Sequence, residues 1–309
     1  MGVYLNSKSA YTLYKNETEQ PYFVDKTLML KELFPLVRTG NNHICITRPR
    51  RFGKTVMANM IASFFSKARD AHDVFDALQI ARFPEYEEYL NQYSVIQISF
   101  NELGGQCSSY QQYIERIEKR LVRDLRKEYP EAGVSDDERA VDALLDIYAE
   151  DESARFIFVL DEWDFIFHQK FIQEEDKKAY LMFLRDLLKD KPYVRLAYMT
   201  GILPIAKYSS GSELNMFAEY TMATEERFSD YFGFTESEVD DLYQRYQQEN
   251  SERVKLTKDE LMNCYDGHQT KAGKMLYNPC SIVLILNYNI EWNWCEHSFT
   301  KQSSLNSCR

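Results

Sequence analysis

Short apolar segments alternate with longer amphipathic ones along the first two thirds of the chain. Four short segments, rich in β-branched and aromatic residues, are predicted to be buried strands, at residues 44–47, 95–100, 156–160 and 194–200. Four longer segments repeat their apolar residues at helical spacing, at residues 54–67, 110–129, 136–149 and 174–189. Nearly continuous apolar strands that alternate with helices are typical of a parallel sheet covered on both faces. The pattern therefore predicts an α/β fold.

After residue 234 the strand pattern stops and the chain becomes more charged and helical. Capping boxes, in which Ser or Thr stands three residues before Glu, mark predicted helix starts at Ser135/Glu138, Thr235/Glu238 and Thr257/Glu260. Tyr265-Asp266-Gly267 is predicted to be a turn, and a further apolar helix is predicted at residues 280–286. We therefore expect an α/β domain at 1–234 and a smaller, helical, lid-like domain at 235–309, with an irregular and truncated tail.

Composition narrows the class of protein without deciding its function. The 309 residues carry a formal net charge of -11, with 44% hydrophobic and 28% charged residues, which is typical of a globular protein. A net negative charge argues against broad, non-specific binding of nucleic acid. No apolar run approaches the ~20 residues that span a bilayer, and the six cysteines lack zinc or disulfide spacing. We expect a soluble, cytoplasmic protein with reduced thiols and no membrane partner.

The strongest chemical signal is the segment Arg48-Pro49-Arg50-Arg51-Phe52-Gly53-Lys54-Thr55, between a predicted strand and a predicted helix. It matches the last three positions of the phosphate-binding pattern G-x-x-x-x-G-K-[ST]. Gly53 lets the backbone approach phosphate oxygens, and the amides of residues 51–55 would face the phosphates at the helix start. Lys54, expected to be partly exposed, would reach the β- and γ-phosphates, and the Thr55 hydroxyl would bind magnesium.

The entry to this loop departs from the usual pattern. Arg48 stands where the first glycine is expected, and Pro49 biases Arg48 toward an extended backbone. Arg50 and Arg51 either stabilise charge on the phosphates or are solvated. The alternative interpretation of the whole segment is a basic turn that precedes a buried helix.

A second signal is the pair of carboxylates, Asp161 and Glu162, that directly follows the predicted strand at 156–160. Asp161 is expected to hold magnesium, directly or through water, and Glu162 to act as the general base that activates water. Asp164 is expected to cap the next helix. Thr200, which ends the following strand, either senses the γ-phosphate or satisfies a loop amide. Arg227 is a candidate arginine finger, although most such arginines form surface ion pairs.

At these residues the sequence resembles the bacterial and archaeal AAA-ATPase-like family, whose members carry an arginine-rich loop of this form. The matching segments span residues 22–286 and are Tyr22-Phe23-Val24-Asp25-Lys26-Thr27, residues 48–55, Leu160-Asp161-Glu162, Thr200-Gly201, Tyr231-Phe232-Gly233-Phe234-Thr235, Tyr265-Asp266-Gly267 and Tyr277-Asn278-Pro279. The resemblance implies a P-loop NTPase core of the ASCE type with a helical lid, and ATP with Mg²⁺ as ligands. It also places Asp25 and Lys26 near the nucleotide.

Many relatives continue into a nuclease-like domain of the PD-(D/E)XK type. After Cys280 this chain has no aspartate and only two glutamates, Glu291 and Glu296, neither followed two positions later by lysine. The residues that this nuclease chemistry needs are therefore missing from the sequence. The tail from Asn287 does not resemble the family, and we expect a truncated or frame-altered end.

Three functions remain open at this stage. The first is a magnesium-dependent ATPase that couples hydrolysis to movement of the lid and to an unknown protein partner, as a monomer or an oligomer. The second is a nucleotide-dependent switch with negligible turnover. The third, a factor associated with DNA, rests only on the nuclease domain of the relatives. The presence of both Lys54 and Glu162 favours the ATPase, because a pure binding module does not need the second acid.

Overall fold

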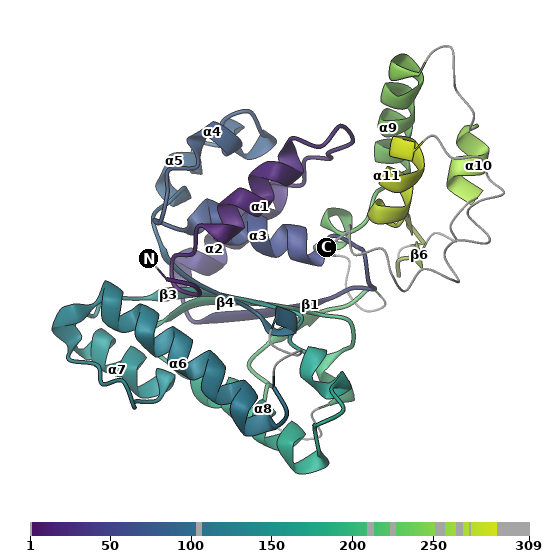
Figure 1. The fold of residues 1–309 in the computed structure, drawn as a ribbon. Coiled ribbons are helices and arrows are strands. Elements are labelled where there is room, and N and C mark those ends of the chain that lie inside the picture. Colours follow the sequence, from purple (N-terminus) through teal and green to yellow (C-terminus); the bar gives the residue numbers. More distant parts are fainter. Residues whose placement is uncertain are drawn as a thin grey trace.

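The computed structural model describes residues 2–102, 107–208, 213–222, 227–250, 257–263, 268–271 and 273–288. The turn predicted at Tyr265-Asp266-Gly267 and the tail from residue 289 lie outside these ranges. Within them the chain forms an α/β fold around one five-stranded sheet, with a group of helices beside it (Figure 1).

All strands of the main sheet run parallel, in the order β2-β3-β4-β1-β5. Their bounds are β1 Asn42–Thr47, β2 Ser94–Ser99, β3 Phe156–Asp161, β4 Val194–Gly201 and β5 Ala218–Tyr220. Every residue of β3 is buried, which agrees with its unbroken apolar sequence. Because the strands are parallel, the residues that follow β1, β3 and β4 meet at one edge of the sheet.

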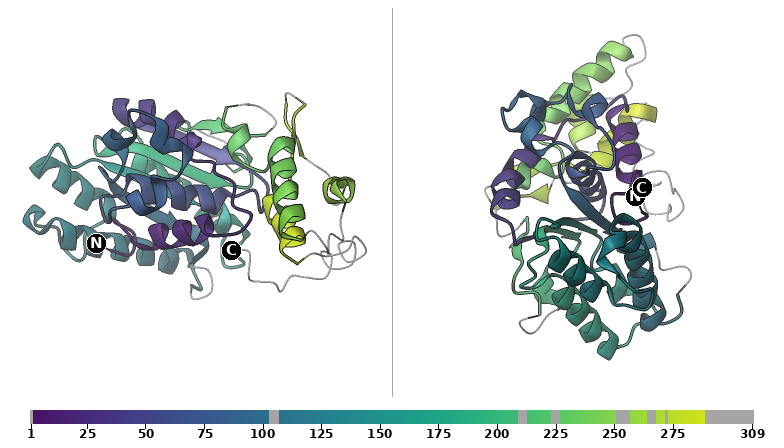
Figure 2. Two further views of the ribbon diagram at one scale, coloured as in Figure 1. Left: turned by 90° about the horizontal axis from the view of Figure 1, so that it is seen from above. Right: turned by 90° about the vertical axis from the view of Figure 1, so that its left-hand side faces the viewer.

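Helices cover both faces of the sheet, as the sequence predicts (Figures 1 and 2). One face packs against α1, α2 and α3, and the other against α6, α7 and α8. Their bounds are α1 Ser9–Thr18, α2 Leu28–Thr39, α3 Lys54–Phe65, α6 Tyr110–Glu128, α7 Ala140–Glu150 and α8 Glu174–Leu188. Two short helices, α4 His72–Phe75 and α5 Tyr86–Tyr89, lie between α3 and β2.

One local prediction needs correction, and one strand is absent from the predictions. The helix expected at 136–149 begins only at Ala140, because Ser135 and Glu138 form a turn in which the Ser135 amide donates to the Glu138 carboxylate at 2.9 Å. The edge strand β5 is not predicted from the sequence, because its three residues are partly exposed and form no apolar run. The predictions for β1 to β4, α3, α6 and α8 are confirmed to within two residues at each end.

The C-terminal helical unit, which we define as the described residues of 235–288, stands beside the sheet rather than on either face (Figure 1). It contains α9 Glu236–Glu249, α10 Lys258–Asn263, α11 Pro279–Tyr288 and a small hairpin of β6 His268–Gln269 with β7 Met275–Leu276. The predicted capping box at Thr235 and Glu238 is present. This unit has its own apolar core, which Tyr22 and Val24 join from the N-terminal part of the chain.

Candidate functional site

The arginine-rich loop, residues 48–55, connects β1 to the start of α3 at the carboxyl edge of the sheet. Arg51 and Gly53 both have a left-handed backbone, with φ of 67° and 81°, so the chain reverses direction tightly before the helix. An added Cβ at Gly53 would meet no atom within 4 Å, so the space in front of this backbone is open. Among the described residues no side chain caps the first turn of α3, and no acidic residue lies in it. The helix therefore begins with amide donors that lack a protein partner.

Lys54 is the first residue of α3, and it is buried, with 6% of its surface exposed. The expectation of a partly exposed charge is therefore wrong. The Lys54 ammonium donates to the carbonyl oxygens of Arg48 at 3.0 Å and Pro49 at 2.8 Å, which holds it across the loop. Burial lowers the pKa of Lys54, and the charges of Asp161 and Glu162 oppose this shift. Because an ammonium has three donors, one N–H remains for a further acceptor.

Arg48 fixes the first residues of the loop. Its side chain is 1% exposed, and its Nη1 donates to the carbonyl oxygens of Thr47 at 2.8 Å and Tyr220 at 2.9 Å. The guanidinium also lies over the ring of Phe232, at 5.2 Å from the centroid. Burial lowers the pKa of Arg48 to about 10. Arg48 thus ties the end of β1 to the edge strand β5, a role that a first glycine could not perform.

The structure brings Thr55, Asp161 and Thr200 together at the carboxyl edge of the sheet. The Thr55 hydroxyl donates to one oxygen of Asp161 at 2.7 Å, and the Thr200 hydroxyl donates to the other. Asp161 is 1% exposed, and burial raises its pKa, while these two hydrogen bonds and the charge of Lys54 oppose the shift. Thr55 itself is exposed, so one side of this cluster faces solvent.

Glu162 follows Asp161 with a left-handed backbone, at φ 53°. This conformation is uncommon for a non-glycine residue and is often found at functional sites. The Glu162 amide donates to the Thr200 hydroxyl at 3.4 Å. Burial raises the pKa of the Glu162 carboxyl, and the charge of Asp161 raises it further, while a hydrogen bond from the Asn101 side chain opposes both. The Thr200 hydroxyl therefore donates to the carboxylate of Asp161 and accepts from the backbone amide of Glu162.

Asp164 does not cap the short helix that follows it, Phe165–His168, contrary to the sequence-based expectation. Its side chain is 1% exposed, and one of its oxygens accepts the amides of Ile202 at 3.0 Å and Leu203 at 3.1 Å. These two residues directly follow Thr200 and Gly201 at the end of β4. Asp164 therefore fixes the loop that carries Thr200, a function that the sequence analysis missed because residues 164 and 202 are remote in the chain.

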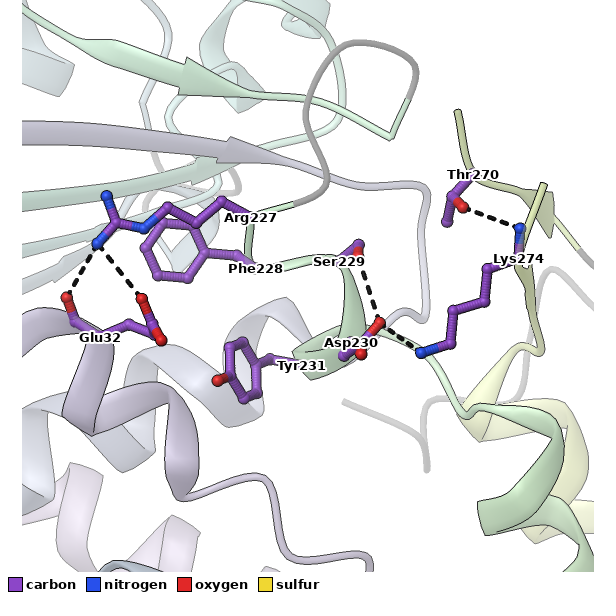
Figure 3. A pocket seen from close by; sticks show the side chains of 8 residues that line it. All are labelled: Glu32, Arg227, Phe228, Ser229, Asp230, Tyr231, Thr270 and Lys274. Carbon is purple, nitrogen blue, oxygen red and sulfur yellow. Dashed lines mark hydrogen bonds and ion pairs between the residues drawn. The ribbon is translucent and has the colours of Figure 1, made fainter. Parts of the chain in front are cut away.

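The remaining arginines of the sequence analysis differ in their surroundings. Arg50 and Arg51 are exposed. Arg227 forms an ion pair with Glu32 of α2, at 3.4 Å, and so has the surface pairing that was the alternative to an arginine finger. Both residues line a pocket of about 380 Å³ between α2, residues 227–231 and the β6–β7 hairpin (Figure 3). On the hairpin side of this pocket, Lys274 pairs with Asp230 at 2.7 Å.

Asp25 and Lys26 hold structural elements together, and their described contacts do not involve the arginine-rich loop. Asp25 accepts the Thr27 amide at 2.8 Å and the Gln79 amide at 2.7 Å, which joins the start of α2 to the segment after α4. The Lys26 ammonium donates to both oxygens of Glu238, at 2.6 and 2.7 Å. Because Glu238 belongs to the first turn of α9, Lys26 connects the N-terminal segment to the C-terminal helical unit.

Within the described ranges no three His, Cys, Asp or Glu side chains gather into a metal site made of protein alone. Magnesium sites in nucleotide enzymes usually combine one or two protein ligands with phosphate oxygens and water, so the pair Thr55 and Asp161 fits such a site. Over the same part of the chain, none of the helices has the length and apolar character needed to cross a membrane.

Comparison with known proteins identifies the family of this chain. The model of the family described as "Predicted AAA-ATPase" matches residues 12–210, which is more than half of the chain, so the protein belongs to this family. The matched region includes the arginine-rich loop, both acids and Thr200. The chain is also 26% identical over 277 residues to an "Uncharacterized protein in vnfD 5'region" from Azotobacter chroococcum mcd 1. That match covers 87% of this chain and 49% of the relative, so the chain spans about half the relative's length.

The position of Asp164 leads to a first prediction. Asp164→Ala leaves the amides of Ile202 and Leu203 without an acceptor, so we expect the free energy of unfolding to fall by about 1–3 kcal/mol. Asp164→Asn keeps one acceptor oxygen and should lose less. Urea unfolding followed by circular dichroism measures both, with Asp146→Ala, at an exposed aspartate of α7, as the control. Equal unfolding midpoints for Asp164→Ala and Asp146→Ala would contradict this role.

Proposed function

We propose that the protein binds ATP together with Mg²⁺ at the arginine-rich loop and hydrolyses it, as an ASCE-type P-loop ATPase. Family membership supports nucleotide binding. The sheet order supports the ASCE assignment, because β4 lies between the strand that precedes the loop and the strand that ends in Asp161. Cores of this type insert one strand at that point.

The observation that carries the proposal is the start of α3. A helix N-terminus bears partial positive charge, and here it also holds the buried ammonium of Lys54. A cation at this end of a helix is unfavourable unless an anion is close. The charges of Asp161 and Glu162 act on Lys54, but its described hydrogen bonds go to the carbonyl oxygens of Arg48 and Pro49 rather than to either carboxylate. A polyphosphate accepting the free amides and the third N–H of Lys54 would satisfy all these donors.

The donor set around Asp161 fits a magnesium ion. The Thr55 hydroxyl gives its only hydrogen to Asp161, so its lone pairs remain available to a cation. Asp161 itself accepts one hydrogen bond on each oxygen and keeps further lone pairs, which water bound to the ion can use. When bound, magnesium would neutralise negative charge on the phosphates. Thr55 and Asp161 would hold it.

Glu162 is the residue that we assign to activation of water. Its pKa is raised by burial and by the charge of Asp161, which favours a general base, because a more basic carboxylate accepts a proton more readily. Thr200, bonded to Asp161 and to the Glu162 amide, would keep the two acids at a fixed separation. The alternative function is a switch that binds ATP without turnover. As the output of the site, we propose only that the bound nucleotide is coupled to the C-terminal helical unit. We assign no protein partner and no oligomeric state.

The metal assignment predicts a specific loss at Thr55. Thr55→Val keeps the shape of the side chain and removes the hydroxyl, so magnesium should no longer strengthen ATP binding. We expect an affinity ratio of about tenfold or more between magnesium and EDTA in the parent, equivalent to ~1.4 kcal/mol or more, and a ratio near one in the variant. Calorimetric titration measures both, and Thr55→Ser, which retains a hydroxyl, should behave like the parent. A full magnesium effect in Thr55→Val would assign the ion to other residues.

Substitutions at the two acids should affect catalysis and binding separately. Glu162→Gln cannot accept a proton, so phosphate release should fall by ~10²–10⁴-fold. Its ATP affinity should be equal to that of the parent or higher, because a negative charge is removed near the phosphates. Asp161→Asn should instead weaken magnesium-dependent binding.

Two outcomes would count against this division of roles. If the parent releases phosphate no faster than Glu162→Gln, the switch without turnover is the correct function. If both acid variants lose binding and turnover to the same degree, the acids act as one coupled unit.

A further inference from the structure

Residues 232 and 233, just before the C-terminal helical unit, contact the arginine-rich loop at two points. The ring of Phe232 lies beneath the guanidinium of Arg48, the first residue of the loop. Gly233 lies against the ring of Phe52, so closely that an added Cβ would stand 3.0 Å from Cε1 and 3.1 Å from Cδ1 of that ring. The loop is therefore contacted at Arg48 and at Phe52 by two consecutive residues that are remote in the sequence.

Phe52 is the residue of the loop whose role the nucleotide chemistry leaves unexplained. Its neighbours Arg50 and Arg51 are exposed, but its own side chain is 1% exposed. Its ring faces away from solvent toward Gly233 and makes an edge-to-face contact with His268 of β6, at 5.1 Å between centroids. A large apolar ring in a phosphate-binding loop contributes no donor to phosphate. Its burial instead attaches the loop to the C-terminal helical unit.

The contact continues into that unit through the backbone. Phe234 and Tyr277 form an antiparallel bridge, with amide-to-carbonyl distances of 2.9 and 2.8 Å. The Tyr277 carbonyl also stands 3.2 Å from the position of a Gly233 Cβ. Thr235 then caps α9, and Pro279 begins α11. A shift of α9 or α11 therefore displaces residues 232–234, and these residues touch the loop directly.

We propose that Phe52 and Gly233 form the coupling contact of this protein, through which the C-terminal helical unit sets the geometry of the arginine-rich loop and thereby its affinity for ATP. Both are positioning residues. Phe52 holds the amides of Gly53 and Lys54 at the start of α3, and Gly233, which has no Cβ, leaves room for the ring. With φ at 84°, Gly233 occupies a conformation that other residues rarely adopt. This inference rests on the proposed function, because it concerns the affinity of the same site.

The test changes Gly233, on the C-terminal side of the contact, and measures ATP binding at the arginine-rich loop. Gly233→Ala introduces a methyl group against Phe52, and we expect ATP binding to weaken about tenfold, although residue 233 lies outside the loop. Gly133→Ala is the matched control, because Gly133 has a similar φ of 65° and no atom within 4 Å of an added Cβ. Both variants place an alanine at a left-handed backbone position, so a difference in ATP affinity reports the contacts of the added methyl group, which are with Phe52 and with the Tyr277 carbonyl. The double variant described next separates these two contacts. Phe52→Leu should restore part of the affinity in the Gly233→Ala background, since the smaller side chain accommodates the methyl group.

A second readout needs no nucleotide. Phe52→Ala should increase hydrogen exchange of the backbone amides in β7 and α11 in the nucleotide-free protein, whereas Phe64→Leu, in the core of α3, should leave that exchange unchanged. Unaltered exchange in Phe52→Ala would overturn the coupling. If the parent binds ATP and Gly233→Ala binds it as tightly as Gly133→Ala, the coupling is wrong and the proposed function stands. If the parent does not bind ATP at all, the proposed function fails, and this inference fails with it.

Discussion

The arrangement of the site depends on the placement of a positive charge at the positive end of a helix. Lys54 begins α3, is buried, and donates to two carbonyl oxygens of its own loop. Such an arrangement is electrostatically unfavourable on its own, because the helix dipole and the ammonium repel each other. Acidic residues at the carboxyl edge of the sheet compensate this positive charge. Asp161 ends β3 and Glu162 directly follows it, and the charges of both raise the pKa of Lys54.

A network of buried polar contacts holds this edge of the sheet in place. Thr55 from α3 and Thr200 from β4 both donate to Asp161 at the end of β3, so three elements meet at one carboxylate. Asp164 fixes the loop after β4, and Arg48 joins the end of β1 to β5. Buried polar groups of this kind favour one arrangement only when their partners are present. The site is therefore a consequence of the strand order, which brings the ends of β1, β3 and β4 together.

The sequence predicts the strands β1 to β4 and most of the long helices because their apolar residues recur at clear periods. It also identifies Lys54, Thr55, Asp161 and Thr200 as neighbours, since parallel strands end at a common edge. Helices α1 and α2 were not predicted. Only Ala10, Tyr11 and Tyr14 of α1 are buried, and α2 contains Pro35, a residue that disfavours the interior of a helix. The burial of Arg48 could not be predicted either, because Tyr220 and Phe232 pack against it from elsewhere in the chain.

The same limitation applies to Lys26 and Phe52. Their partners, Glu238 and Gly233, lie about 200 residues away, and no local pattern connects them.

The central claim is that the start of α3 is an anion site completed by Lys54. Its most direct test is the midpoint of thermal unfolding at rising concentrations of magnesium and ATP, for the parent and for Lys54→Met, which keeps the length of the side chain and removes its charge. At a hundred times the dissociation constant, bound nucleotide should stabilise the parent by about 2.7 kcal/mol, and Lys54→Met should show little or no rise. A parent whose midpoint does not respond to ATP, or a Lys54→Met variant that responds as strongly, would contradict the claim.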